Sequence, residues 1–233
     1  EATATGHYAE ATAVALDALR QRAVRDFQAR VEMARLRRQH ADALETTARL
    51  QQALDSAAEE EARLVHAATH DALTGCPNRA LLHERLNSAI RRARATGRHL
   101  AVAFVDVNGL KTVNDQQGHA AGDLLVCGVA YSLRAVNGPH DTVARVGGDE
   151  FVIVVVARAD EQGCLAWVEE LREVLQPWDG SADHVPASRA SAGVCVVAPA
   201  CALPGEAILA RADELMYQAK AAGGAHPAVE LLV

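Results

Sequence analysis

Several features that define other classes of protein are missing from this 233-residue sequence. No apolar run approaches the roughly 18 residues that a membrane-spanning helix needs, and no charged and then apolar signal peptide opens the chain. These absences predict a cytoplasmic protein. An excess of basic residues is missing too, since the formal net charge is −7, and this disfavours binding to nucleic acid or to an anionic membrane.

Cysteine motifs are also missing. The five cysteines are odd in number and scattered, and no pair has the CxxC spacing of a zinc site or a redox motif. We therefore expect neither a disulfide framework nor a zinc site, but reduced thiols that fill the core as small hydrophobic side chains: Cys76, Cys127, Cys164, Cys195 and Cys201.

Glycine and proline are absent between Gly6 and Gly75, where Ala, Arg, Glu, Gln and Leu dominate, and this composition predicts uninterrupted helix. Apolar residues recur there at spacings of three and four, which indicates a coiled coil or helical hairpin that pairs with a second chain. The pattern weakens between Arg37 and Ala43, so one helix and a bent bundle both remain open. The apolar positions are Leu16, Leu19, Ala23, Phe27, Val31, Ala34, Leu50, Leu54, Ala57, Leu64 and Ala68.

Residues 1–69 are accordingly predicted to form a helical dimerisation and signalling region, and residues 70–233 a catalytic domain. The first residue is Glu1 rather than Met. We expect from this that the chain is an excised or processed piece with a sensor module upstream.

The second region has the mixed patterns of an α/β domain, with a mainly antiparallel central sheet flanked by helices. A hairpin lies at its centre, with strands at 142–146 and 151–156. The other predicted elements are helices at 80–94, 122–136, 163–175 and 206–222 and strands at 100–107 and 187–197.

The tip of this hairpin reads Gly147-Gly148-Asp149-Glu150-Phe151. Glycine tolerates positive φ and lets another group approach the backbone closely, so both properties are expected here. Adjacent carboxylates in a tight turn repel each other unless a cation lies between them. The turn therefore predicts a metal.

A second group of polar residues follows the predicted strand 100–107, about forty residues upstream of the hairpin tip. Asp106 ends that strand, where an acid is easily exposed toward a metal, and Gly109 opens backbone amides to a phosphate. Asn114 and Asp123 together accept and donate hydrogen bonds in a pattern suited to a purine edge. Candidate residues for binding a nucleotide and a metal thus occur in a single segment of the sequence.

The two motifs resemble the signature of the GGDEF family, the diguanylate cyclases that condense two GTP into cyclic di-GMP. The resemblance covers about residues 70 to 225 and implies a nucleotidyl-cyclase, palm-like fold. Further matching segments are Asp71-x-Leu73-Thr74, Gly118-His119-x-x-Gly122-Asp123, Ala190–Val194 and Met216-Tyr217-x-Ala219-Lys220.

The resemblance implies a role for each matching position. Asp106, the carbonyl of Val107 and Asp149 would hold two Mg²⁺ per active half-site, with Mn²⁺ as the alternative metal. Asp149 or Glu150 would help to deprotonate the attacking 3′-hydroxyl, with Asp149 favoured, and Lys111 would assist catalysis. The substrate-binding residues would be Asn114, His119 and Asp123 around guanine and Gly109, Leu110, Lys111, Gly147, Gly148 and Lys220 around the phosphates.

One such domain binds one GTP, so the resemblance implies that two domains face each other in a homodimer. The N-terminal helices would pair the two chains, either to regulate the approach of the domains or simply to tether them. The alternative function is a catalytically weak GTP-binding sensor that signals through the coiled coil.

Three positions depart from the family pattern. Asn108 stands where a second aspartate is common, which leaves one fewer charge near the metals. Gly138 replaces the arginine of the Arg-x-x-Asp product-inhibition site that ends at Asp141, so feedback inhibition should be weak or absent. Gly224 stands where a basic residue often follows Lys220, so one phosphate contact is missing.

Overall fold

The structure is a computed structural model that describes residues 2–156, 160–176, 190–224 and 226–233, with side chains from residue 16 onward. The chain forms two compact units, one that ends at Arg63 and one that spans Leu64–Val233. In the described part of the chain, no helix combines the length and the hydrophobicity that a membrane span requires.

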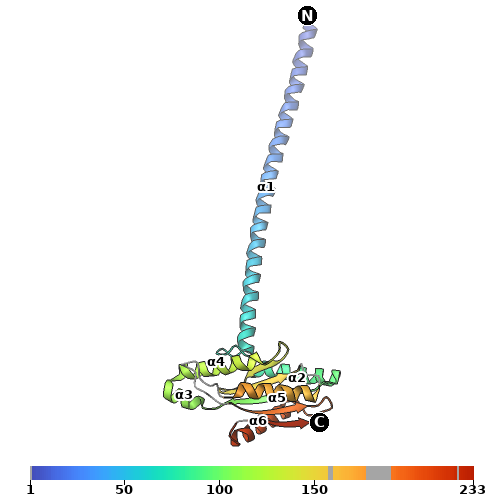
Figure 1. Ribbon diagram of the computed structural model, residues 1–233. Helices are drawn as coiled ribbons and strands as arrows, with labels where there is room; N and C mark the ends of the chain where they lie inside the picture. The colour runs from blue at the N-terminus through green and yellow to red at the C-terminus, as the bar shows by residue number, and fades with distance from the viewer. Residues whose placement is uncertain (1, 157–159, 177–189, 225) are drawn as a thin grey trace. The chain divides into compact units, whose positions relative to one another are not determined.

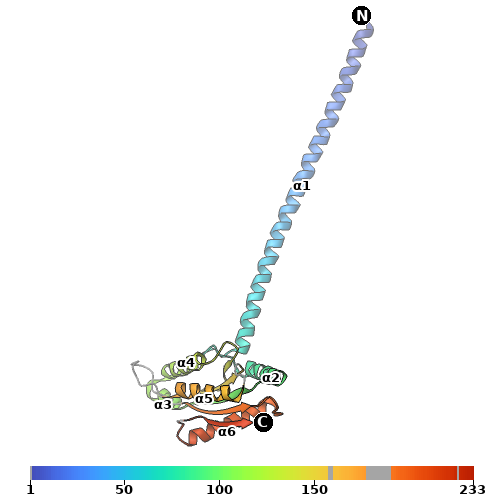
Figure 2. The ribbon, with the colours of Figure 1, turned by 45° about the vertical axis from the view of Figure 1, so that its right-hand side comes forward.

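The N-terminal helix α1 runs from Ala2 to Thr69 without interruption (Figure 1 and Figure 2), so the region of weak pattern between Arg37 and Ala43 does not break it. Its apolar side chains are exposed in the single chain; Leu50 and Leu54, for example, are 61% and 65% exposed. A helix of this kind is stable in water when a second helix covers its apolar stripe.

The second unit holds a five-stranded sheet in the order β2-β3-β1-β4-β5. Pairing is antiparallel from β2 to β4, and β4 and β5 are parallel. The elements are α2 (Arg79–Thr96), β1 (Leu100–Val107), α3 (Leu110–Gln117), α4 (His119–Ala135), β2 (Thr142–Arg145), β3 (Glu150–Val155), α5 (Glu161–Leu175), β4 (Ala190–Val197), α6 (Gly205–Ala221) and β5 (Ala228–Leu232).

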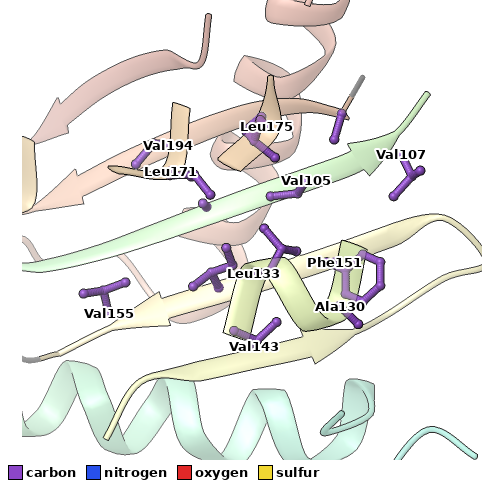
Figure 3. Packing of buried hydrophobic residues seen from close by; sticks show 14 of the residues in the cluster. Val105, Val107, Ala130, Leu133, Val143, Phe151, Val155, Leu171, Leu175 and Val194 are labelled. Carbon is purple, nitrogen blue, oxygen red and sulfur yellow. The ribbon is translucent and has the colours of Figure 1, made fainter. Parts of the chain in front are cut away.

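Each face of the sheet is covered by two helices, because the strands are apolar on both sides. On one face Leu133 of α4 and Leu171 of α5 pack with Val105 and Val194, as Figure 3 shows. On the other face α2 and α6 pack against alternate residues of the same strands, so α4 and α6 lie on opposite sides of the sheet (Figure 2). The predicted mainly antiparallel α/β sandwich is confirmed.

Helix α6 lies unusually close to β4. A Cβ atom added at Gly193 of β4 would lie 2.1 Å from the backbone nitrogen of Met216, so only glycine fits beneath the helix. This contact brings the end of α6, with Lys220, toward the end of the neighbouring strand β1.

The sequence patterns do not predict α3 or β5. Helix α3 buries a single side chain, Val113, so it shows no apolar periodicity. Strand β5 lies at an edge of the sheet, with Val229 and Leu231 exposed and Leu232 alone buried. Of the strand predicted at 187–197, residues 187–189 lie outside the described residues, and 190–197 form β4 as expected.

The cysteines are free thiols, as expected. Cys76, Cys164, Cys195 and Cys201 are buried, which confirms their role as small core residues, whereas Cys127 on α4 is only half-buried. Burial raises the pKa of the Cys195 thiol to about 12, so this side chain behaves as an uncharged core group.

Candidate nucleotide and metal site

The candidate site lies where the central strands end. Asp106, near the end of β1, is paired in register with Glu150 of β3 on one side and Ser191 of β4 on the other. The Asp106 side chain is 12% exposed, and its Oδ1 accepts a hydrogen bond from Lys220 Nζ at 2.6 Å. Residues distant in sequence, from β1, β3 and α6, are thus brought to one end of the sheet.

The β2–β3 turn is held by backbone contacts. Val146 N–H donates to the Glu150 carbonyl at 2.9 Å and Val107 N–H donates to the Asp149 carbonyl at 2.9 Å. Arg145 Nη2 donates to the carbonyl of Gly148 at 2.7 Å. The peptide units on both sides of the Asp149 Cα are therefore anchored, one to β1 and one to an arginine side chain.

The two glycines of the turn differ from the expectation. Positive φ is found at other glycines but at neither Gly147 nor Gly148, so that part of the prediction is wrong. Close approach is found at Gly147, because a Cβ atom there would lie 2.3 Å from Oε2 at the end of the Glu150 side chain. A Cβ atom at Gly148 would meet nothing within 4 Å, so this backbone faces open space.

Negative charge accumulates around Glu150. Burial raises the pKa of this carboxyl above its ordinary value, the charges of Asp149, Asp213 and Asp106 raise it further, and Arg79 opposes the shift. Glu150 lines a pocket of about 300 Å³ between α2 and α6, together with Phe104. An excess of carboxylate charge of this kind favours a cation, which fits a divalent metal.

The predicted metal ligands, Asp106, the carbonyl of Val107 and Asp149, come from two neighbouring segments at the end of the sheet. Among the side chains that the structure describes, no three His, Cys, Asp or Glu residues are grouped as a metal site. Asp106 lies in β1, Asp149 lies in the turn directly before β3, and Lys220 neutralises Asp106. The predicted donor set is hard oxygen, as Mg²⁺ prefers, and it has only two carboxylates, so it stays a prediction.

The predicted guanine residues lie at the α3–α4 corner. Asn114 of α3 packs against the start of α4 so closely that a Cβ atom at Gly122 would lie 2.0 Å from Asn114 Oδ1. Asp123 is the next residue and is exposed, as are His119 and Lys111. Gly109, the residue directly before α3, has a φ of 82°, a backbone conformation that favours glycine.

Two of the departures from the family pattern are neighbours in space. Asn108 Nδ2 donates to Ser191 Oγ at 2.9 Å. A Cβ atom at Gly224 would lie 2.7 Å from the same Ser191 Oγ and 3.5 Å from Asn108 Nδ2. Neither Asn108 nor Gly224 carries a charge, so these two positions add no charge to the site.

The sequence reasoning missed the role of Arg145. Its Nη1 donates to Asp71 Oδ1 at 2.9 Å, and the Arg145 and Asp71 side chains are 13% and 25% exposed. Burial disfavours the Asp71 charge, but hydrogen bonds from Thr74 and Arg145 outweigh it and lower the pKa of Asp71 below the ordinary value of 3.8. An arginine two residues before the double glycine was the available signal.

This ion pair predicts a pH-dependent stability. Because the folded pKa of Asp71 lies below 3.8, its stabilisation is fully present above that value and is lost as the pH falls through the folded pKa. Asp71→Asn should lower the free energy of unfolding by about 2 kcal/mol at neutral pH. The difference from the unmodified chain should stay constant down to about pH 5 and shrink below about pH 4 in urea titrations. A difference that stays constant to pH 3 would contradict this assignment.

Comparison with known proteins agrees with this geometry. Residues 68–226 match the family model described as diguanylate cyclase, GGDEF domain. The chain belongs to the GGDEF family. It is 39% identical over 168 residues to the bifunctional diguanylate cyclase/cyclic di-GMP phosphodiesterase MucR of Pseudomonas aeruginosa, covering 72% of this chain and 24% of MucR. It is 36% identical over 162 residues to the diguanylate cyclase TpbB of the same species, covering 70% of this chain and 37% of TpbB.

Solved structures of GGDEF domains share the fold. The GGDEF domain of TpbB has a TM-score of 0.62 at 33% identity, covering 69% of this chain and 93% of that one. The coiled coil and GGDEF domain of DgcB from Caulobacter crescentus, in complex with c-di-GMP, has a TM-score of 0.65 at 24% identity. That alignment covers 84% of this chain and 99% of the DgcB chain. The chain of this protein spans well under half of the length of MucR and of TpbB.

Proposed function

We propose that this protein is a diguanylate cyclase that condenses two GTP into cyclic di-GMP and two pyrophosphates. The observation that carries the proposal is the register of Asp106 beside Glu150, with Lys220 bonded to Asp106 and the Asp149 turn anchored to β1. Family membership supports the same reaction.

The side chains divide the chemistry among them. Asp106, the carbonyl of Val107 and Asp149 would hold two Mg²⁺, or Mn²⁺, which when bound supply charge neutralisation for the triphosphate. Asp149, or next to it Glu150, accepts the proton of the 3′-hydroxyl. Lys220 places an ammonium beside these acids, where it can neutralise phosphate oxygens.

Substrate selection is assigned to the α3–α4 corner. Asn114 and Asp123 offer acceptors and a donor to the guanine edge, with His119 nearby. The phosphates would lie along Gly109, Leu110 and Lys111 and along the turn, where the open backbone at Gly148 leaves room for them. The substrate is thus GTP rather than ATP.

The reaction needs two domains face to face, since the 3′-hydroxyl of one nucleotide attacks the α-phosphorus of the other. We assign the pairing of chains to α1, whose apolar side chains are exposed. Pairing raises the effective concentration of the second half-site, and a change in the coil would bring the domains together or apart. A cytoplasmic location and an upstream sensor are part of this proposal.

The deciding experiment is incubation of the protein with GTP and Mg²⁺, followed by chromatographic separation of the nucleotides. The expected result is cyclic di-GMP and pyrophosphate in a ratio of one to two. Bound GTP with no cyclic dinucleotide would instead support the alternative, a GTP-binding sensor module that signals through the coiled coil.

Product inhibition through the turn before the hairpin should be weak or absent. Gly138 has no guanidinium to grip a guanine edge, and Asp141 is already engaged. Its Oδ2 accepts from Gly138 N–H at 2.8 Å and its Oδ1 from Val156 N–H at 2.9 Å. Titration of the cyclase with cyclic di-GMP should show no saturable inhibition in the micromolar range. A submicromolar inhibition constant that Asp141→Ala abolishes would contradict this expectation.

A further inference from the structure

We propose that Arg145 and Asp71 form a clamp that positions the catalytic turn and ties it to the end of α1. Arg145 is a positioning residue in this scheme, because it contacts the backbone of the turn and not the reacting groups. The activity measurement that tests this clamp rests on the proposed cyclase function. The structural measurement rests only on the contacts of Arg145.

Arg145 is anchored at three points. Its backbone N–H donates to the Pro77 carbonyl at 2.9 Å. In its side chain, Nη1 donates to Asp71 Oδ1 at 2.9 Å and Nη2 donates to the Gly148 carbonyl at 2.7 Å. The side chain is 13% exposed. The guanidinium donates to acceptors on two separate segments from two different nitrogens in a fixed planar fork, a geometry that the single nitrogen of lysine does not reproduce.

The acceptor on the turn is the peptide that precedes Asp149. The carbonyl of Asp149 itself is held by Val107 N–H at 2.9 Å. Release of the Gly148 carbonyl would therefore free one of the two peptide units that set the direction of the Asp149 side chain. A displacement of about 1 Å at a reacting group is enough to reduce a rate about a hundredfold.

The acceptor at the other end lies two residues beyond α1. Asp71 N–H donates to the Cys76 carbonyl at 2.8 Å, and Asn78 closes the same loop on the last helical turn. Asn78 N–H donates to the Thr69 carbonyl and Asn78 Nδ2 to the Ala68 carbonyl, both at 2.8 Å. Arg79 Nη2 adds a bond to the Val146 carbonyl at 3.1 Å. A continuous set of hydrogen bonds thus joins the helix end to the turn.

The consequence is regulatory. A shift of the last turn of α1 moves the 70–78 loop, and with it the carboxylate that holds one branch of Arg145. The other branch holds the catalytic turn, so the ordering of Asp149 depends on the state of the helix. This coupling acts within one chain and is separate from the pairing of two domains.

The test compares Arg145→Gln with Arg94→Gln in the full 233-residue chain. Arg94 is a matched control, because its guanidinium also donates to loop carbonyls, those of Cys201 and Leu203, on another part of the domain. Arg145→Gln should lower kcat at least about tenfold with KM for GTP changed less than about threefold. Arg94→Gln should leave kcat within about twofold of the unmodified protein.

Amide hydrogen exchange, measured by mass spectrometry without nucleotide, supplies the structural readout. Peptides that cover residues 146–151 should exchange faster in Arg145→Gln than in Arg94→Gln at equal thermal stability. Unchanged exchange together with unchanged kcat would overturn the clamp. If the unmodified protein formed no cyclic di-GMP, the proposed function would fail while the exchange result would still decide the clamp.

A double-mutant cycle tests the link to Asp71. Asp71→Asn alone should accelerate exchange in the same peptides, and adding it to Arg145→Gln should have little further effect, because both changes release the same carbonyl. Additive effects of the two substitutions would overturn the coupling to α1.

Discussion

Replacing Asp106 by Asn is expected to lower the rate of cyclic di-GMP formation about a thousandfold while the domain stays folded. Asp106 is 8% exposed and is the buried acid of the site, in register with Glu150 and bonded to Lys220. Asparagine has nearly the same volume but no charge, so it cannot offset a divalent metal or hold the ammonium of Lys220 as strongly. The measurement is the initial rate of product formation with saturating GTP and Mg²⁺.

Glu84→Gln is the matched control for this substitution. It also replaces a carboxylate by its amide, but Glu84 lies on the exposed face of α2. Its rate should stay within about twofold of the unmodified protein. A rate for Asp106→Asn within tenfold of the control, with both variants folded by circular dichroism, would remove Asp106 from the metal site.

Charge in the apolar stripe of α1 should produce the second large effect. The double substitution Leu50→Asp and Leu54→Asp places carboxylates on the face that we assign to helix pairing, where both leucines are exposed in the single chain. In a dimer, each catalytic domain meets its partner domain at an effective concentration near millimolar. In separated chains at submicromolar protein that concentration is lost, so the specific activity should fall about a hundredfold or more. It should also rise in proportion to protein concentration, and sedimentation should show a monomer.

Gln52→Asp controls for the added charge. This residue lies between the two leucines in sequence but on a different face of the helix, outside the three-and-four spacing. It should leave both the dimer and the specific activity unchanged. A leucine variant that remained a fully active dimer would exclude pairing through α1.

Much of the fold follows from short-range pattern. The hairpin, strand β1 and helices α2, α4, α5 and α6 all lie within a few residues of their predicted ranges, because strands buried on both faces and amphipathic helices leave strong periodic signals. Helix α3 and strand β5 escaped because each buries a single side chain. The metal and guanine roles remain predictions, although Asp106, Glu150 and Lys220 do lie together.

The linear pattern was sufficient to name the chemical groups of the candidate site: the acids, the glycines and the lysine occur in motifs that predict oxygen ligands and phosphate contacts. It was also sufficient to place α1, since residues 7–69 contain no glycine or proline and helical hydrogen bonds join residues only four apart. Which groups meet was decided by tertiary structure alone. Lys220 reaches Asp106 because Gly193 lets α6 lie directly on β4, and Arg145 joins Asp71 to Gly148 because β2 lies beside the loop that follows α1. Such contacts depend on strand order and close packing between distant segments, which no local periodicity encodes.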